Sequence, residues 1–322
     1  MKHLFIINPA AGKKDQTEDF TRVIHRECSH RGLDYEIRIS SCKGDCTRLT
    51  EEAARSGAEY RIYACGGDGT LNEVVNGAAN FENVAVTHFP GGSGNDFIRN
   101  FSQPEAFSDL GRLLDARETQ MDLIRVNDRA YSLNICSMGI DARIAAEVQR
   151  YKRLPGISGH GAYNLSLAVN LIKGIRRYCE VEIDGQVLRD KQTLVCICNG
   201  RFYGGGFNPV PEARPDDGLL DVLIIKGVSL LTAARVIGKY KRGEYASLPR
   251  YITYYRVKEL TIRFPKENVI NVDGESLWDR EATFSVLPRK LRFFYPKGLT
   301  YAAETEENSS KTEETSDILV KC

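Results

Sequence analysis

The chain has 322 residues, a length that is typical of about two domains. Hydrophobic residues make up 42% of it and charged residues 27%, so disorder over most of the chain is excluded because there is enough apolar mass to bury. The 44 Lys and Arg residues against 43 Asp and Glu residues leave a net charge of +1, which argues against a nucleic-acid partner held by a general positive field.

No apolar run approaches the roughly 18–20 residues that a membrane-spanning helix needs. The N-terminal apolar stretch meets Gly12 and Lys13 too soon for a signal peptide. The nine cysteines are odd in number and form no CxxC pair, so neither a disulfide framework nor a zinc site is expected. We therefore expect a cytoplasmic protein whose contact with a membrane is peripheral.

The first half of the chain alternates strand and helix patterns. This order predicts a doubly wound parallel sheet with helices on both faces. In such sheets ligands bind at the carboxyl ends of the strands, so the loops after Asn8, Cys65 and Phe89 are the candidate binding loops. The predicted strands are 3–8, 34–40, 59–65 and 83–89, and the predicted helices are 17–30, 46–57 and 71–79.

The second half carries many short strand patterns separated by turn signals, which predict an antiparallel sheet or β-sandwich. Asp184-Gly185 lies between two β-rich runs in 180–198 and is a strong hairpin signal. The other predicted strands are 122–137, 219–225, 257–264, 282–287 and 291–295, and two predicted helices interrupt them at 161–177 and 229–242.

These patterns predict an α/β domain over residues 1–125 and an all-β sandwich domain over 126–290. The sequence leaves open whether residues 291–302 return to the first domain. The tail, 303–322, holds six acidic and two basic residues with little apolar patterning, and we expect it to be disordered.

Three glycine-rich turns follow predicted parallel strands at Asn8–Gly12, Gly66–Glu73 and Pro90–Asp96. Glycine allows backbone N–H groups to converge on an anion, and the helix that begins near Thr70 directs its N-terminus toward the same place. Three such turns on one sheet edge predict a polyphosphate site. The spacing matches neither a P-loop nor the Rossmann G-x-G-x-x-G pattern, which disfavours a dehydrogenase.

The segment GGDGTLNEVVNG at 66–77 resembles the nucleotide-binding signature of the diacylglycerol kinase catalytic domain family, which includes bacterial soluble lipid kinases and sphingosine and ceramide kinases. The resemblance implies ATP and Mg²⁺ as cofactors and a lipid alcohol as acceptor, in a cleft between an α/β domain and a β-sandwich domain. The resemblance extends, in the order of the family, to NPAAG at 8–12, PGGSGNDF at 90–97, PDDGLLDV at 215–222 and VDGE at 272–275.

The turns and the resemblance together assign the nucleotide to a set of residues that follow the parallel strands. The third turn departs from the family pattern at Gly91 and Ser93, although Ser93 keeps a hydroxyl, and Ser40 stands where the family often has threonine. Alternatively, the only role of the Glu73 carboxylate is a favourable interaction with a helix dipole. The nucleotide-binding set is Asn8, Pro9, Ala10, Ala11, Gly12, Ser40, Gly66, Gly67, Asp68, Gly69, Thr70, Asn72, Glu73, Ser93, Asn95 and Asp96.

Three acidic positions are assigned to the chemistry. Asp68, among glycines, is predicted to bind the catalytic Mg²⁺, because this ion prefers carboxylates and phosphate oxygens. Asp273-Gly274 alone would be a hairpin turn, but the resemblance places the proton acceptor at Glu275 with Asp273 beside it. If Glu275 is not the base, Asp273 or Asp68 is left to take that role.

The resemblance also implies a second, structural Mg²⁺ at the PDDG segment. Asp217 would bind it, and the backbone carbonyls of Arg214 and Leu219 would complete the protein ligands. The alternative is a turn with two solvated acids.

Two stretches are strongly basic in a nearly neutral protein. Residues 150–177 hold six basic residues and no acid, and residues 235–258 hold seven basic residues and one acid. Such stretches would favour an anionic membrane surface. The alternative is a pair of core-packed helices with solvated basic faces.

The sequence as a whole predicts an ATP-dependent lipid kinase similar to diacylglycerol kinases. An NAD kinase-like enzyme and a catalytically silent nucleotide- or lipid-binding regulator are the alternatives. The sequence does not identify the particular lipid, and it leaves open whether the protein forms a homodimer. No nucleic-acid partner is expected.

Overall fold

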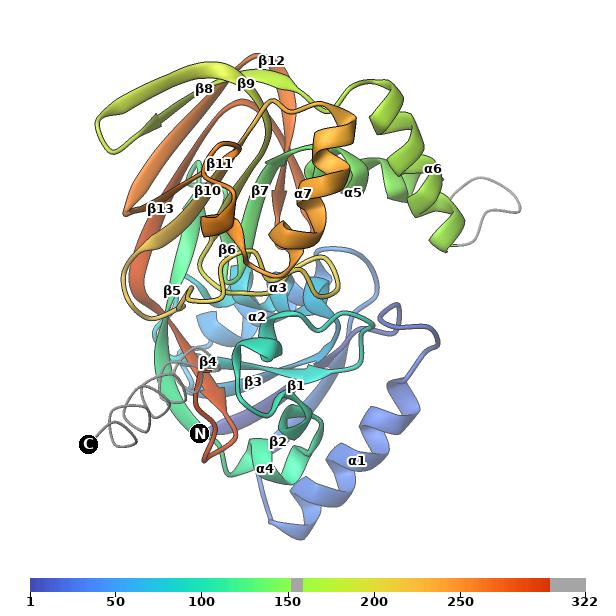
Figure 1. The fold of residues 1–322 in the computed structure, drawn as a ribbon. Helices are drawn as coiled ribbons and strands as arrows, with labels where there is room; N and C mark the ends of the chain where they lie inside the picture. Colours follow the sequence, from blue (N-terminus) through green and yellow to red (C-terminus); the bar gives the residue numbers. More distant parts are fainter. Residues whose placement is uncertain (152–158, 302–322) are drawn as a thin grey trace, which may run out of the picture. The chain divides into compact units, whose positions relative to one another are not determined.

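The structure is a computed structural model that describes residues 1–151 and 159–301 (Figure 1). These residues form two compact units. Among the described residues, the first unit contains Met1–Gln120, Pro211–Arg214 and 291–301, and the second is drawn from Met121–Val210 and Pro215–Lys290. The boundary therefore falls inside strand β5 (Arg117–Val126), before the expected position near residue 125. The tail that was expected to be disordered, 303–322, lies outside the described residues.

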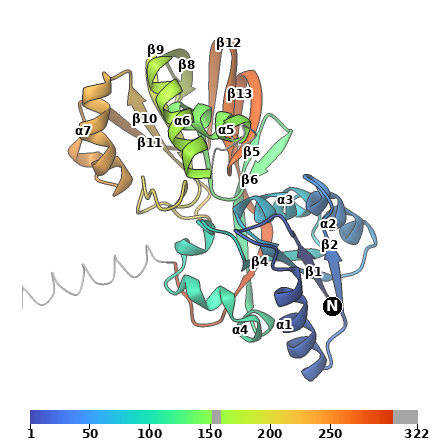
Figure 2. The same cartoon turned by 90° about the vertical axis from the view of Figure 1, so that its right-hand side faces the viewer.

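The first unit contains a parallel sheet in the order β4-β3-β1-β2, which confirms the α/β prediction. Helices α2 and α3 cover one face of this sheet, and α1 and α4 lie on the other (Figure 2). The strands are β1 (Lys2–Ile7), β2 (Tyr35–Ile39), β3 (Tyr60–Gly66) and β4 (Val84–Pro90), and the helices are α1 (Thr17–His30), α2 (Asp45–Arg55), α3 (Asp68–Ala78) and α4 (Leu110–Leu114).

Burial explains the strand patterns of this sheet. The central strands β1, β3 and β4 are almost wholly buried because helices cover both faces, and their sequences are accordingly apolar nearly throughout. The edge strand β2 is only partly buried and carries Glu36 and Arg38. Because all four strands are parallel, the turns that follow β1, β3 and β4 lie at one edge of the sheet.

The end of the chain joins the first unit through aromatic packing. Phe293, in the last part of β13 (Glu275–Tyr295), pairs with Val86 of β4. The Phe293 ring lies 5.3 Å from that of Phe97, and Phe101 packs against Tyr295 and Tyr301. Residues from Leu291 therefore contribute to the first unit's core, which the sequence left open. The short 3-10 helices here are η1 (Phe97–Asn100) and η2 (Pro104–Ser108).

The second unit is an antiparallel β-sandwich, as predicted, around a core of aliphatic side chains. Its strands pair in the order β11-β10-β9-β7-β12-β13, while β8 pairs with β9 and β12, and β5 with β6 and β13. Asp184 and Gly185 both have positive φ, 50° and 69°, as the predicted two-residue hairpin turn requires. The strands not yet given are β6 (Ala130–Ser132), β7 (Ile135–Gly139), β8 (Arg177–Ile183), β9 (Gln186–Cys198), β10 (Leu220–Lys226), β11 (Ile252–Val257) and β12 (Glu259–Val272).

The helices of this unit differ in part from the prediction. Helix α7 (Leu230–Lys241) matches the expected 229–242, but α6 (Gly159–Ile172) ends well before residue 177. Gly174, with a φ of 84°, follows the end of α6, and β8 begins at Arg177. Helix α5 (Ile140–Tyr151) was not predicted, and a 3-10 helix, η3 (Tyr245–Ser247), follows α7. None of the helices in the described part of the chain is long and apolar enough to cross a membrane.

Candidate active site

The three glycine-rich turns of the first unit pack backbone against backbone. The amide of Gly91 donates to the carbonyl of Gly66 at 2.7 Å. A Cβ atom on Gly92 would lie 2.4 Å from the Cα of Gly67, and one on Gly12 would lie 2.6 Å from the carbonyl oxygen of Gly91. Side chains are therefore excluded where the turns meet. Closely packed glycine turns of this kind are compatible with an approach of backbone N–H groups to an anion.

Asn8 and Thr70 link the first turn to the second. The Asn8 Nδ2 donates to the Thr70 Oγ1 at 3.0 Å, and its Oδ1 accepts from the Ala10 amide at 3.0 Å. Thr70 is buried, and a Cβ on Gly66 would lie 2.3 Å from its hydroxyl. These side chains fix the shape of both turns, so a direct role toward a nucleotide would come chiefly from the backbone around them.

Asp68 is the first residue of α3 and connects the second turn to the third. Its Oδ1 accepts from the Asp96 amide at 2.6 Å, and within the described residues its Oδ2 accepts no hydrogen bond. Asp68 thus lies at the N-terminus of α3, next to the positive end of the helix dipole. Burial lowers the pKa of the neighbouring His88, whose neutral imidazole donates from Nε2 to the Gly66 carbonyl at 2.9 Å. Asp68 therefore presents one carboxylate oxygen that fits a hard cation such as Mg²⁺.

The third turn divides its polar side chains between the surface and the interior. Ser93 is exposed at the turn, where its hydroxyl can reach a ligand. Asn95 has a φ of 50° and donates from Nδ2 to the Gly92 carbonyl at 3.0 Å. Asp96 is buried. Asn95 and Asp96 thus hold the turn in shape.

Glu73, a predicted nucleotide contact, instead caps a neighbouring helix. Its Oε1 accepts from the Gly44 amide at 2.9 Å and its Oε2 from the Cys46 amide at 3.1 Å, both at the N-terminus of α2. The carboxylate therefore satisfies two amides that the helix leaves open. Ser40 and Asn72, from the same predicted set, are both buried. The helix-dipole alternative for Glu73 fits the structure, with α2 rather than its own helix as the partner.

Replacing Glu73 by alanine is expected to destabilise the protein rather than weaken nucleotide binding. Loss of two charge-assisted hydrogen bonds at a helix N-terminus costs about 1–3 kcal/mol, which lowers the melting temperature by several degrees. Thermal unfolding and the KM for ATP measure the two effects separately. Glu51→Ala removes an exposed α2 carboxylate that pairs with Arg55 and is the matched control. A raised KM with an unchanged melting temperature would restore the nucleotide role.

In the second unit, Asp273 and Gly274 form the two-residue turn between β12 and β13, with φ values of 48° and 93°. The Asp273 carboxylate accepts from the amides of Leu133 and Ile135, each at 2.8 Å. Burial raises the pKa of Asp273, while these backbone hydrogen bonds lower it. Asp273 thus holds the segment before β7, and its two oxygens are engaged. Glu275 is the half-buried first residue of β13.

Asp122, a residue that the sequence analysis missed, organises the PDDG loop. Its buried carboxylate accepts from the Gly218 amide at 2.6 Å and from the Arg289 amide at 2.7 Å, and its own amide donates to the Pro215 carbonyl at 2.8 Å. Burial raises the pKa of Asp122. The sequence signal for this role is an acidic residue within the apolar run MDLI at 121–124. Acidic side chains are rarely buried unless they have partners, so an acid in an apolar strand indicates a structural or functional role.

The structural Mg²⁺ site at Asp217 stays a prediction, and the described residues already engage both carboxylate oxygens of Asp217. Its Oδ1 accepts from the Leu219 amide at 3.0 Å, and its Oδ2 is paired with the Arg256 guanidinium. Arg256 also lies 3.7 Å from the Asp221 carboxylate, so an arginine already supplies the positive charge. Nowhere in residues 1–151 and 159–301 do three or more His, Cys, Asp or Glu side chains form a group suited to a metal.

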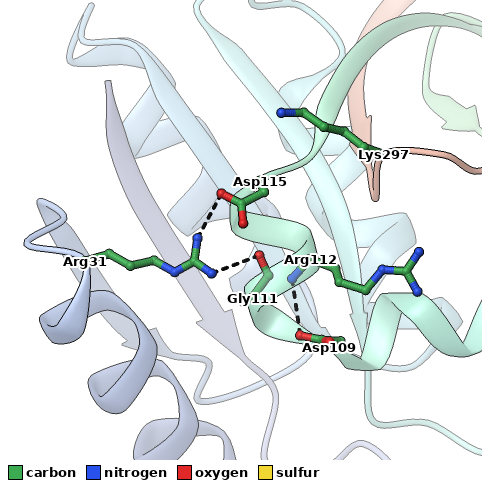
Figure 3. A pocket seen from close by; sticks show the side chains of 6 residues that line it. All are labelled: Arg31, Asp109, Gly111, Arg112, Asp115 and Lys297. Atoms are coloured by element: carbon green, nitrogen blue, oxygen red, sulfur yellow. Dashed lines mark hydrogen bonds and ion pairs between the residues drawn. The ribbon is translucent and has the colours of Figure 1, made fainter.

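A pocket of about 390 Å³ in the first unit lies away from these turns (Figure 3). Arg31, just after α1, donates to Asp115 at 2.9 Å and to the Gly111 carbonyl at 3.4 Å. The pocket contains none of the predicted site residues. Because α1 runs back from the turn edge, its end at Arg31 lies at the opposite edge of the sheet. The residues that line the pocket are Arg31, Asp109, Gly111, Arg112, Asp115 and Lys297.

Comparison with known proteins gives the same two-part division. Residues 2–126 match the family described as the diacylglycerol kinase catalytic domain, and residues 134–295 match the YegS C-terminal NAD kinase beta sandwich-like domain. A diacylglycerol kinase of Staphylococcus epidermidis is 29% identical over 318 residues and covers 97% of each chain. A diacylglycerol kinase of Bacillus subtilis is 27% identical and covers 91% of this chain and 95% of its own.

A crystal structure of a candidate diacylglycerol kinase from Bacillus anthracis superposes with a TM-score of 0.73 at 25% identity, over 93% of this chain and 98% of its own. Fold and turns define the class: an α/β unit with three packed glycine-rich turns, joined in the chain to an antiparallel β-sandwich unit. The chain belongs to the family that joins a diacylglycerol kinase catalytic domain to a YegS-type C-terminal domain. The resemblance seen in the motifs is thereby confirmed, and the protein is a kinase-type phosphotransferase.

Proposed function

We propose that the protein transfers the γ-phosphoryl group of ATP to the hydroxyl of diacylglycerol or a related lipid alcohol, in a Mg²⁺-dependent reaction. The observation that carries this proposal is the convergence of three glycine-rich turns around the Asp68 carboxylate. The names of relatives that cover nearly the whole chain support diacylglycerol as the acceptor. The match to the diacylglycerol kinase catalytic domain favours this reaction over NAD phosphorylation.

In the first unit, backbone N–H groups of the three turns would bind the phosphates, and the exposed Ser93 hydroxyl would add a contact. Asp68 would hold Mg²⁺ through its Oδ2. When bound, this ion neutralises the charge of the phosphate oxygens. The tight packing of Gly12, Gly67 and Gly92 keeps the turns rigid, so little reorganisation is needed when charge shifts during transfer.

In the second unit, Glu275 would act as the general base. Its carboxylate would accept the proton of the lipid hydroxyl as that oxygen forms a bond to the γ-phosphorus, while the bond to the ADP oxygen breaks. Asp273 would position this residue by fixing the hairpin turn. The silent-regulator alternative is disfavoured because both Asp68 and Glu275 are present.

A lipid acceptor also implies where in the cell the protein acts. We propose a cytoplasmic protein that contacts the membrane surface peripherally, because its substrate resides in the bilayer. Of the two basic stretches, part of 150–177 (residues 152–158) lies outside the described residues. The stretch 235–258 is described throughout.

The proposal is tested by phosphate transfer from labelled ATP to lipid alcohols in mixed micelles. The panel includes diacylglycerol, monoacylglycerol, ceramide, sphingosine and phosphatidylglycerol, and NAD is assayed in parallel. We expect labelled phosphatidic acid from diacylglycerol. Labelled NADP would establish the NAD kinase alternative. Bound ATP without transfer to any acceptor would instead favour a silent regulator.

A further inference from the structure

Helix α7 presents large aliphatic side chains to the outside of the second unit. The relative exposure of Leu230 is 48%, that of Leu231 is 73% and that of Ile237 is 52%, while Val236 and Tyr240 of the same helix are buried. At 100° per residue, the three exposed side chains fall on one side of the helix. A contiguous exposed apolar face of this kind marks a surface that binds a partner or a membrane.

The inner side of α7 fixes this orientation. Val236 and Tyr240 are buried, and the Tyr240 hydroxyl lies 2.9 Å from the Tyr203 hydroxyl. At the N-terminus, the Ser229 side chain caps the helix by accepting from the Thr232 amide. The helix cannot roll to hide its outer aliphatic side chains without breaking these contacts. Figure 2 shows α7 on the outside of the unit's sheet.

The apolar face is flanked by positive charge. Between residues 226 and 258 the sequence has one acidic residue, Glu244, and this residue pairs with Arg242 at 2.5 Å. Arg235, Lys239 and Lys241 add three more cations along α7. An apolar face bordered by cations, on a helix that does not span a membrane, is the pattern of a helix that lies in the interface of an anionic bilayer.

We propose that α7 docks the protein on an anionic lipid surface, with Leu230, Leu231 and Ile237 entering the headgroup region and the flanking cations contacting lipid headgroups. This inference rests on the proposed function, since a lipid acceptor requires contact with a bilayer. A second copy of the chain is a poorer occupant. A two-fold interface would place the same cations of both copies against each other.

The test is sedimentation of the full chain with vesicles of equal parts phosphatidylglycerol and phosphatidylcholine. Leu231→Gln with Ile237→Gln is expected to weaken binding at least about tenfold. Arg235→Gln with Lys239→Gln is expected to weaken it by about tenfold or more, because each cation near an anionic surface contributes about a fivefold change. The wild type is expected to bind vesicles of phosphatidylcholine alone much more weakly.

The matched control substitutions change exposed residues of the same kinds that lie outside α7. Val187→Gln changes a 44% exposed aliphatic residue in the β8–β9 hairpin, and Lys266→Gln with Lys290→Gln removes two exposed cations elsewhere. Neither control is expected to change binding. Equal loss in the control and α7 variants, or full binding by both α7 variants, overturns the proposal. A change from dimer to monomer in the aliphatic α7 variant, with unchanged vesicle binding, assigns the face to a second copy and also overturns it.

The failure of this proposal can be told apart from failure of the proposed function. A short-chain diacylglycerol dissolved as monomers needs no surface, so the α7 variants are expected to phosphorylate it at the wild-type rate. On vesicle-borne diacylglycerol the same variants are expected to lose rate in parallel with binding. If the wild type phosphorylates no lipid in either form, the function fails, while vesicle binding still decides the role of α7.

Discussion

Glu275→Gln is expected to lower kcat by about a hundred- to ten-thousandfold, the usual contribution of a positioned general base. Glutamine has nearly the same shape as glutamate but cannot accept the hydroxyl proton. Its backbone pairing with Val272 at the start of β13 is unaffected, so the fold is expected to remain intact. Transfer to diacylglycerol is measured at saturating ATP, and nucleotide binding is measured separately by calorimetry, where little change is expected.

Two neighbours of Glu275 serve as controls. Ser276→Ala changes the exposed next residue of β13 and is expected to leave kcat unchanged. Asp273→Asn weakens the carboxylate's hold on the Leu133 and Ile135 amides, so its main effect is expected to be a lower melting temperature. Near-normal turnover in Glu275→Gln would contradict the assignment and move the base role to Asp273 or Asp68.

Asp68→Asn is expected to lower kcat/KM about a hundred- to thousandfold. Removal of one preorganised electrostatic group from an enzyme active site typically has an effect of about this size. The amide keeps an oxygen for the Asp96 amide hydrogen, so the turn retains its shape. It loses the charge that would hold Mg²⁺, so the concentration of Mg²⁺ needed for half-maximal activity is expected to rise. Weaker binding of Mg-ATP distinguishes this variant from Glu275→Gln.

The matched control is Asp34→Asn, which removes an exposed carboxylate just before β2, at the opposite edge of the same sheet. It is expected to leave both the activity and the Mg²⁺ requirement unchanged. Unaltered Mg²⁺ dependence in Asp68→Asn would remove Asp68 from the metal site and leave it a purely structural link between the second and third turns.

Local patterns were sufficient where local chemistry decides the structure. Helix 17–30 was predicted with the bounds of α1, because its apolar spacing is helical and polar residues precede it. The Asp184-Gly185 hairpin followed from two residues that tolerate positive φ. Helix α5 was not predicted because it follows β7 directly, without a connecting loop: Gly139 ends the strand and Ile140 begins the helix.

Side-chain partners were harder to predict than elements. Glu73 is in the predicted nucleotide set because it lies within the GGDGTLNEVVNG segment, but its carboxylate accepts from the amides of Gly44 and Cys46, which are remote in the chain. Likewise, the Arg256 guanidinium forms an ion pair with the Asp217 carboxylate, although the two residues lie far apart in the sequence. Such pairings depend on which loops the fold brings together.

The amino-acid sequence was enough to predict the two-part architecture, the three glycine-rich turns and the family, because glycine spacing and hydrophobic period act over a few residues. The three-dimensional structure was needed to show that Phe293 joins the first unit, that Asp122 shapes the PDDG loop and that Asp273 is engaged by backbone amides. These outcomes rest on contacts between residues far apart in the chain, where burial and unsatisfied backbone groups set the partner. The exposed face of α7 also depends on tertiary contacts, since the sequence pattern of the helix alone does not show which of its sides is buried.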